Sequence, residues 1–292
     1  MEFISVKEAS KKWNISERSV RNYCENNRID KAFLKGKTWY IPSNALKPSR
    51  RGTSILLEVL KDEKGKKYAG GIYHKTQIEL TYNSNHIEGS KLTHEETRYI
   101  YETNTIGIGN KAISVNDIIE TVNHFRCIDY IIDSAEKKLS ETMIKEIHRI
   151  LKSSSVDQYK YSFKVGEYKT YPNEVGGRET TLPSDVGYKM KELLLSYNSK
   201  KKITLFDIID FHVEFERIHP FQDGNGRVGR LIMFKECLRN NITPFIITDE
   251  DKTNYYRGIN EWGKINEYLL DTILTAQDIY KSYLNYFQIP LK

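Results

Sequence analysis

One twelve-residue segment combines glycine, arginine and acidic side chains as no other part of the chain does: His219-Pro220-Phe221-Gln222-Asp223-Gly224-Asn225-Gly226-Arg227-Val228-Gly229-Arg230. A helix is expected to end before Pro220, because proline restricts the residue that precedes it, and a new helix is expected to begin near Gly226. Glycines at the start of a helix leave backbone N–H groups open where the helix dipole is positive, which favours phosphate. The segment therefore predicts an anion site at a helix N-terminus.

The side chains of this segment supply what a transfer reaction on a phosphate needs. Arg227 and Arg230 lie three residues apart on the first helical turn, so they share a face and can both bind phosphate oxygens. Asp223 is a hard oxygen ligand suited to Mg²⁺, and His219 is the only nearby side chain that can accept a proton near pH 7. No activated serine or cysteine nucleophile is evident. The pattern indicates phosphoryl or nucleotidyl transfer by direct attack of an acceptor hydroxyl.

The twelve residues resemble the Fic-domain signature HPFx(D/E)GNGRxxR at every fixed position. The resemblance extends from about Ser84 to the C-terminus and implies a small helical bundle with a β-hairpin flap, here Val175 to Leu182. It also implies transfer of AMP from ATP to a Ser, Thr or Tyr hydroxyl of a target protein, with release of pyrophosphate. The other interpretation is a structural capping loop with His219 as a packed core residue. It is disfavoured because burying these charges without a phosphate is costly.

The resemblance implies one role for each motif residue. His219 would deprotonate the target hydroxyl, and Asp223 would bind Mg²⁺. Gly224, Asn225 and Gly226 would hold the α-phosphate, Arg227 and Arg230 would hold the β- and γ-phosphates, and Phe221 would anchor the loop in the core. The related Doc kinases carry lysine where this chain has Gly226, so Gly226 favours adenylyl transfer.

A second motif precedes the first: Ser84-Asn85-His86-Ile87-Glu88-Gly89 resembles the pattern (S/T)xxxE(G/N) of inhibitory helices in one Fic subclass. Glu88 is predicted to pair with Arg230 and to repel the triphosphate, since like charges at close range repel strongly where the dielectric is low. Ser84, one turn earlier on the same helix face, could hydrogen-bond alongside. The competing interpretation is a solvated glutamate at a helix end. In some relatives the same glutamate positions water to remove AMP, so the reverse reaction stays open.

Side chains that cap helices mark where the elements of the body begin. We expect helices from Thr93 toward Asn104, over Asp117–Ile132 after Ser114, over Glu141–Lys152 after Ser140, over Asp185–Tyr197 after Ser184, and over Leu205–Ile218 after Thr204. The pair Gly176-Gly177 between β-prone residues predicts the flap hairpin. The body is therefore predicted to be mainly α-helical.

Three residues that follow the motif helix are candidates for contact with the nucleotide base. Family members place a tyrosine or asparagine against the adenine, and Tyr256, with Tyr255 and Asn260, lies in that part of the chain. Packing is the competing interpretation in a chain with 20 tyrosines. His148 and His212 lie among apolar residues at helical spacing and are expected to be structural.

The first fifty residues predict two short helices followed by a hairpin. The helices run from a capping box at Ser5 and Glu8 to about Trp13, and over Glu17 to Asn26 after Ser16; the strands are residues 32–34 and 38–41 around Gly36. The arrangement resembles the winged helix-turn-helix of excisionase and MerR-type proteins, which implies DNA binding by residues 1–50. The alternative is a small basic domain that docks on a partner or on the second domain.

The positive charge is concentrated in the same fifty residues. They contain eleven Lys and Arg against five Asp and Glu, whereas the other 242 residues contain 34 of each. The whole net charge of +6 therefore lies there, which favours a polyanionic partner. Residues 47–54 are predicted to form a linker in which Arg50 and Arg51 can also contact phosphates. We expect a domain at 1–50, a linker and inhibitory-helix region at 51–110, and the Fic core at 111–292.

Composition excludes several classes of protein. No segment approaches the ~18 apolar residues of a membrane helix, and residues 1–5 lack the basic and apolar regions of a signal peptide. Three widely spaced cysteines, Cys24, Cys127 and Cys237, argue against a disulfide framework or a CxxC metal site. They favour a reducing compartment, so we expect a cytoplasmic protein.

Three hypotheses for function follow. The leading one is a self-inhibited, Mg²⁺-dependent protein adenylyltransferase that uses ATP and carries an N-terminal DNA-binding module. The rival is a DNA-binding transcriptional regulator whose Fic core senses a nucleotide, which the intact His219 disfavours. The third is transfer of another nucleotide or of a phosphoryl group. The target is expected to add an extended segment to the flap as a strand, and a homodimer is compatible with the sequence.

Overall fold

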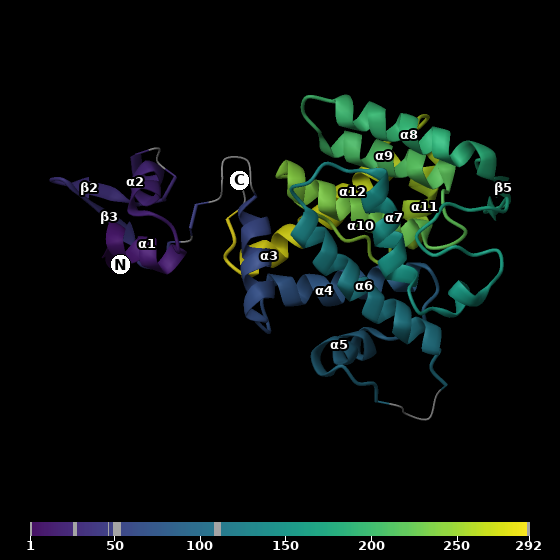
Figure 1. Ribbon diagram of the computed structural model, residues 1–292, viewed down its shortest axis with the longest axis horizontal. Coiled ribbons are helices and arrows are strands. Elements are labelled where there is room, and N and C mark those ends of the chain that lie inside the picture. Colours follow the sequence, from purple (N-terminus) through teal and green to yellow (C-terminus); the bar gives the residue numbers. More distant parts are fainter. Residues whose placement is uncertain (1, 26–27, 46, 49–53, 108–111, 291–292) are drawn as a thin grey trace. The chain divides into compact units, whose positions relative to one another are not determined.

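The computed structural model describes residues 2–25, 28–45, 47–48, 54–107 and 112–290 (Figure 1). Its internal contacts divide the chain into two compact units, Met1–Ile55 and Leu56–Lys292. Arg50 and Arg51, the predicted phosphate contacts of the linker, lie outside the described residues.

The N-terminal unit contains two helices and a three-stranded antiparallel sheet. Its elements are β1 (Phe3–Ser5), α1 (Val6–Trp13), α2 (Glu17–Glu25), β2 (Phe33–Lys35) and β3 (Thr38–Pro42), with strand order β1-β3-β2. The capping box at Ser5 and Glu8 is confirmed, and so is the hairpin, which turns at Gly36 with φ of +64°. β1 was not predicted, because three residues show no alternation of polar and apolar side chains.

One small core holds the N-terminal unit together. Val20 and Cys24 form the inner face of α2 and pack with Val6, Ala9, Trp13, Ile29 and Ile41. Ile41 is fully buried on β3 and pairs with Ile4 of β1. The hairpin is thus fixed to the two helices through apolar side chains of the sheet.

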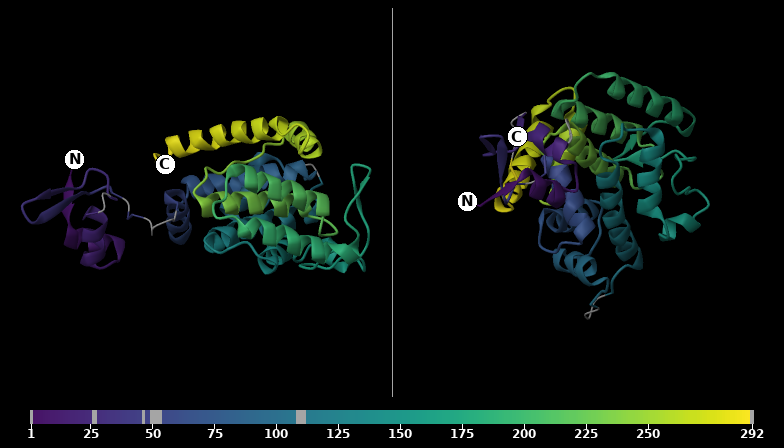
Figure 2. Two further views of the ribbon diagram at one scale, coloured as in Figure 1. Left: turned by 90° about the horizontal axis from the view of Figure 1, so that it is seen from above. Right: turned by 60° about the vertical axis from the view of Figure 1, so that its left-hand side comes forward.

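The C-terminal unit is a bundle of helices with one short hairpin (Figures 1 and 2). Its elements are α3 (Ile55–Lys66), α4 (Ile72–Ile87), α5 (His94–Thr103), α6 (Val115–Ser134), α7 (Glu141–Lys152), η1 (Val156–Tyr159), β4 (Glu174–Val175), β5 (Arg178–Glu179), α8 (Pro183–Ser199), α9 (Leu205–Ile218), α10 (Asn225–Asn240), α11 (Lys252–Glu261) and α12 (Glu267–Tyr286). In Figure 2, α12 forms an outer layer along one side of the bundle. The mainly α-helical prediction is confirmed.

α10 runs through the centre of the bundle and packs against α4, α6, α7 and α9. All its residues from Arg227 to Leu238 are buried, so charged side chains within it must be paired. Lys235 and Glu236, for example, bond to each other at 2.6 Å, and Tyr197 donates to Glu236 at 2.9 Å. Because α10 is enclosed on all sides, its N-terminal end is a fixed platform.

Most of the predicted helix caps are confirmed, and one is wrong. Thr93, Ser114, Ser140 and Thr204 each accept a hydrogen bond from the backbone N–H three residues later. α8 instead begins at Pro183 after Leu182, so Ser184 lies inside its first turn. Proline at the first helical position has its φ already set for the helix and lacks an N–H that would be unsatisfied there, and this outweighs a serine cap one residue later.

Two further expectations concern the whole chain. Cys24, Cys127 and Cys237 are free and buried. None of the helices in the described ranges combines the length and the apolar character that crossing a membrane requires.

Candidate active site

The glycine-rich loop connects the end of α9 to the start of α10. His219 ends α9 in the left-handed conformation, with φ of +51°, and Gly224 precedes α10 with φ of +84°, where glycine is favoured. Asn225 clamps the loop: its Oδ1 accepts from the Phe221 N–H and its Nδ2 donates to the Phe221 carbonyl, both at 2.8 Å. The Asn225 side chain is therefore used within the loop.

Phe221 and His148 hold the loop against the bundle. Phe221 is fully buried, and its ring stacks on that of His148 with centroids 3.9 Å apart. His148 Nδ1 accepts from the Gly166 N–H at 2.9 Å, so Nε2 carries the proton and donates to the Asp223 carbonyl at 3.2 Å. Burial lowers the pKa of His148 to about 3, which keeps it neutral and the loop tied down.

His219 is placed to act as a base. Its side chain is 15% exposed, and burial, followed by the charge of Lys169, lowers its pKa to about 4. Its Nδ1 lies 3.9 Å from Glu216 Oε2 and makes no hydrogen bond with any described residue. A neutral imidazole at pH 7 can accept a proton.

Two charged residues beside His219 were not identified from the sequence. Glu216 is largely buried, and burial, followed by the charge of Glu88, raises its pKa to about 8. Lys169 is 4% exposed, and burial lowers its pKa to about 8. Both residues lie in segments with no motif of their own, so no sequence signal distinguishes them from surface charges.

Lys169 connects the flap to the glycine-rich loop. Its ammonium donates to Asn173 Oδ1 at 2.7 Å and to Thr180 Oγ1 at 2.5 Å. Its backbone N–H donates to the Pro220 carbonyl at 2.8 Å. The hairpin β4–β5, which turns at Gly176 and Gly177, is therefore anchored beside His219.

Arg227 is held by carboxylates. Its guanidinium pairs with Glu120 of α6 and lies 3.4 Å from Asp223 Oδ2, while its Nε has no partner in the described chain. Burial alone would raise the pKa of Asp223, but the charges of Lys152 and Arg227 outweigh burial. The net pKa is therefore well below its ordinary value, and the carboxyl is ionised. Lys152 Nζ contacts Asp223 Oδ2 at 2.5 Å. Neither Glu120 nor Lys152 was identified from the sequence.

Arg230 is held by the end of α4, as predicted. It donates to Glu88 Oε1 at 2.7 Å, to Ser84 Oγ at 2.9 Å and to the Ser84 carbonyl at 2.9 Å. Burial alone would raise the pKa of Glu88, but the charges of Arg230 and Arg227 outweigh burial, so the net pKa is below its ordinary value. A Cβ atom at Gly226 would overlap Glu88 Oε1, so any other residue here would force this carboxylate to shift.

A cavity of about 540 Å³ opens between the flap and α11. Tyr256 and Asn260 line it, together with flap residues and Glu216, and Arg178 of β5 donates to Asn260 Oδ1 at 3.3 Å. Tyr255 does not line it: it is fully buried and hydrogen-bonds His212 Nε2 at 2.6 Å. Of the three candidates for base contact, only Tyr256 and Asn260 thus face the cavity.

Comparisons with known proteins identify the fold of this unit. Residues 138–237 match the Fic/DOC family. A Fic domain-containing signalling protein from Bacteroides thetaiotaomicron is 25% identical with a TM-score of 0.62, over 78% of this chain and 94% of that one. A fragment of Fic-1 from C. elegans is 19% identical with a TM-score of 0.61, over 80% of this chain and 72% of that one. The predicted Fic-type helical core is confirmed.

Curated relatives carry the name protein adenylyltransferase Fic. The relative from Nematostella vectensis is 28% identical over 187 residues, which are 62% of this chain and 42% of that protein. The relative from Drosophila melanogaster is 31% identical over 180 residues, or 60% of this chain and 35% of that protein. The chain thus spans less than half the length of these relatives.

Proposed function

We propose that the chain is a protein adenylyltransferase that moves AMP from ATP to a Ser, Thr or Tyr hydroxyl of a target protein. The observation that carries this proposal is a partly buried, neutral His219 beside the N-terminus of α10, where Arg227 and Arg230 are buried. Arg227 Nε and Arg230 Nη1 have no hydrogen-bond partner among the described residues. An unpaired buried donor is costly, so a ligand rich in oxygen atoms would complete both.

ATP would occupy two cavities of the bundle. The nucleoside would enter the 540 Å³ cavity against Tyr256 and Asn260. The α-phosphate would accept from backbone N–H groups of Gly224, Asn225 and Gly226, which is consistent with the Asn225 side chain being used within the loop. The β- and γ-phosphates would lie against Arg227 and Arg230, near a second cavity of about 220 Å³ that Arg227 and Asp223 line.

Asp223 is suited to hold Mg²⁺ because it is ionised, offers oxygen ligands and has a half-exposed side chain. When bound, the ion would neutralise charge on the phosphates. His219 would take the proton of the target hydroxyl, and the hydroxyl oxygen would attack the α-phosphorus. The bond between the α-phosphorus and the oxygen that bridges it to the β-phosphate would break. Pyrophosphate leaves, and the target carries AMP.

Glu88 would inhibit the reaction by occupying Arg230. Its Oε1 lies too close to Gly226 for a Cβ to fit there without a shift, within the region proposed for the phosphates, so the carboxylate would compete through charge and volume. Ser84 would support Arg230 in this position. The same carboxylate would be close enough to the bound nucleotide to orient a water molecule, so removal of AMP belongs to the proposal as a second activity.

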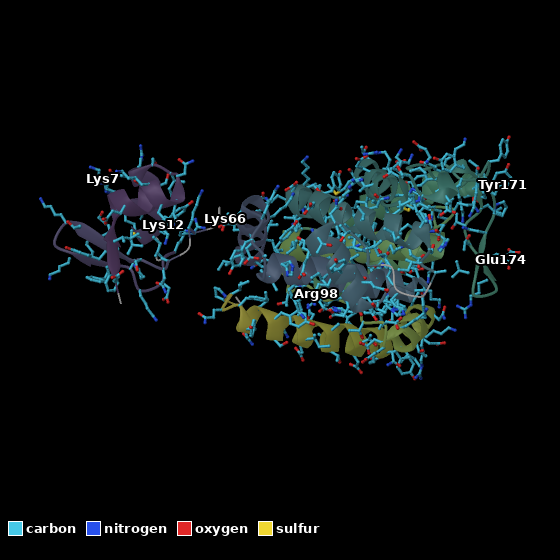
Figure 3. All side chains as sticks on the ribbon, turned by 90° about the horizontal axis from the view of Figure 1, so that it is seen from below. Lys7, Lys12, Lys66, Arg98, Tyr171 and Glu174 are labelled. Atoms are coloured by element: carbon cyan, nitrogen blue, oxygen red, sulfur yellow. The ribbon has the colours of Figure 1, made fainter. Side chains whose placement is uncertain are left out.

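The target would reach His219 by adding a strand to the flap. Each strand of the β4–β5 hairpin is only two residues long, and Figure 3 shows Glu174 of β4 and nearby Tyr171 pointing outward. Short exposed strands offer unpaired N–H and C=O groups to an extended segment.

We further propose that residues 1–50 bind DNA. The support is the excess of six positive charges in this segment, together with two helices and a basic-tipped hairpin around one core. A labelled DNA library should yield a preferred site whose affinity falls steeply as salt rises. A specific site without AMP transfer would favour the regulator with a nucleotide-sensing core.

The test of the transferase is label transfer from α-labelled ATP with Mg²⁺, alone and with a cell lysate. The parent should label protein weakly, Glu88→Gly strongly and His219→Ala not at all. Label from γ-labelled ATP would instead indicate phosphoryl transfer. Absence of label from either donor in all three proteins would contradict the proposal. Gel filtration of the same proteins tests for a homodimer. A comparison of the parent with Glu88→Gly shows whether Glu88 affects that oligomeric state.

A further inference from the structure

Lys152 places a buried ammonium among three carboxylates. It lies at the end of α7 and is 1% exposed. Its Nζ contacts Glu120 Oε1 and Asp223 Oδ2 at 2.5 Å and Asp157 Oδ2 at 2.7 Å. Oxygens of these three carboxylates lie within 4.8 Å of one another. A buried ammonium has lost its hydration, and only such close partners offset that loss.

The charges around Lys152 balance without a metal ion. Arg227 pairs with Glu120 and lies 3.4 Å from Asp223, and Lys160 pairs with Asp157 at 2.5 Å. Three carboxylates therefore meet three cations. A free divalent cation would add two positive charges beside the buried Lys152 ammonium, which is unfavourable because like charges repel.

Two more carboxylates line the adjacent 220 Å³ cavity, and both have partners. Glu88 is paired with Arg230. Asp117 accepts hydrogen bonds from the Lys91 N–H at 2.9 Å and from Ser90 Oγ at 3.3 Å. Glu88 is therefore neutralised by Arg230, whereas Asp117, whose partners are uncharged, offers one negative charge against the two positive charges of a divalent cation.

We propose that Lys152 is a positioning residue that acts as the resident counter-ion of Asp223. In the nucleotide-free protein its ammonium takes the place beside Asp223 that a divalent cation would take. Because a triphosphate brings negative charge with it, the divalent cation enters together with the nucleotide and not before it. The inference rests on the proposed role of Asp223 as a metal ligand.

The test measures Mn²⁺ binding to the full-length protein without nucleotide, from the electron paramagnetic resonance signal of free Mn²⁺. The parent should bind Mn²⁺ weakly. Lys152→Met removes the ammonium, keeps an unbranched side chain and leaves the three carboxylates together, so Mn²⁺ should bind about tenfold more tightly or better. Adding Asp223→Asn to Lys152→Met should abolish this gain.

Lys160→Met is the matched control. It removes one positive charge from the same cluster, but from an exposed side chain at its edge, and leaves Lys152 in place. Its Mn²⁺ affinity should stay like that of the parent. A gain as large as that of Lys152→Met would mean that only net charge matters, and it would overturn the proposal.

The parent protein alone also tests the proposal, should Lys152→Met not fold. Equilibrium dialysis of the parent should retain Mn²⁺ with a non-hydrolysable ATP analogue beyond the amount that the analogue itself holds, and little without it. Tight retention without the analogue would overturn the proposal. None of these readouts requires AMP transfer, so failure of the proposed reaction and failure of the Lys152 proposal are separate results.

Discussion

Arg227 and Arg230 lie one turn apart on α10 and are both buried, yet different parts of the bundle hold them. Arg227 is paired with Glu120 from the middle of α6, next to the buried Lys152. Arg230 is paired with Glu88 at the C-terminal end of α4, where the carboxylate is 26% exposed. One arginine belongs to a network of several charged side chains from different helices, and the other to a contact at a helix end. The acidic partner of Arg227 is also less exposed than that of Arg230.

The largest difference should appear in stability. Glu120→Ala would leave Arg227 and Lys152 buried with one carboxylate fewer, which should lower the free energy of unfolding by about 3–5 kcal/mol. Glu88→Ala should cost less, about 2 kcal/mol, because Arg230 stays buried but keeps its hydrogen bonds to Ser84. Urea unfolding of both proteins measures the difference. Equal losses would mean that the two arginines are held alike.

A double-mutant cycle should detect the close approach of Gly226 and Glu88. Gly226→Ala places a Cβ on Glu88 Oε1, so it should lower stability in the parent but much less in a Glu88→Gly background. The coupling free energy should be about 1–3 kcal/mol. Gly187→Ala is the matched control, because nothing lies within 4 Å of a Cβ at this helical position. Additive effects of Gly226→Ala and Glu88→Gly would show that the carboxylate does not occupy this space.

Ser84→Ala should have a smaller effect. It removes one hydrogen bond from Arg230 Nε but leaves Glu88 and the Ser84 carbonyl as partners. We expect a loss of about 1–2 kcal/mol in the free energy of unfolding, together with a modest rise in AMP transfer. Parallel unfolding and label-transfer measurements check both. A rise as large as that of Glu88→Gly would mean that Ser84, and not Glu88, holds Arg230.

Mild acid should leave the Glu88–Arg230 pair unchanged. The pKa of Glu88 is lowered from its ordinary value, because the arginine charges outweigh the effect of burial. A carboxyl group with a lowered pKa is fully ionised above its ordinary pKa, and the stability that its charge contributes is complete there. That contribution is lost only as the pH falls through the lowered pKa. With the pKa of His219 at about 4, the base also stays neutral. The ratio of AMP transfer by Glu88→Gly to that by the parent should therefore change by less than about twofold between about pH 7.5 and 5.5.

The residues that could be predicted from the sequence depend on local sequence patterns, and those that could not depend on contacts between distant parts of the chain. The motif residues and the caps at Thr93, Ser114, Ser140 and Thr204 depend on neighbours within a few positions, so short patterns identify them. Glu88 and Arg230 are 142 residues apart, and only the family resemblance indicated their contact.

Other site residues are brought together by packing alone. Glu120, Lys152 and Asp157 come from α6, α7 and η1, and each is an ordinary charged residue in its local sequence. Glu216 and Lys169 likewise have unusual pKa values because the folded protein buries them. Ser184 is not the cap of α8, because Pro183 takes the first helical position. Local patterns therefore predict where elements begin, and burial of charge has to be seen in the fold.

The stacked rings of His148 and Phe221 provide a natural spectroscopic reporter of the catalytic loop. Their planes are inclined by only 2°, so the ring protons of each lie in the shielding region of the other's aromatic current. Nuclear magnetic resonance should show these protons strongly displaced to low frequency. Any movement of the loop that separates the rings would return the signals to ordinary positions. These ring-proton signals would therefore report, without an added probe, whether the loop is ordered in solution.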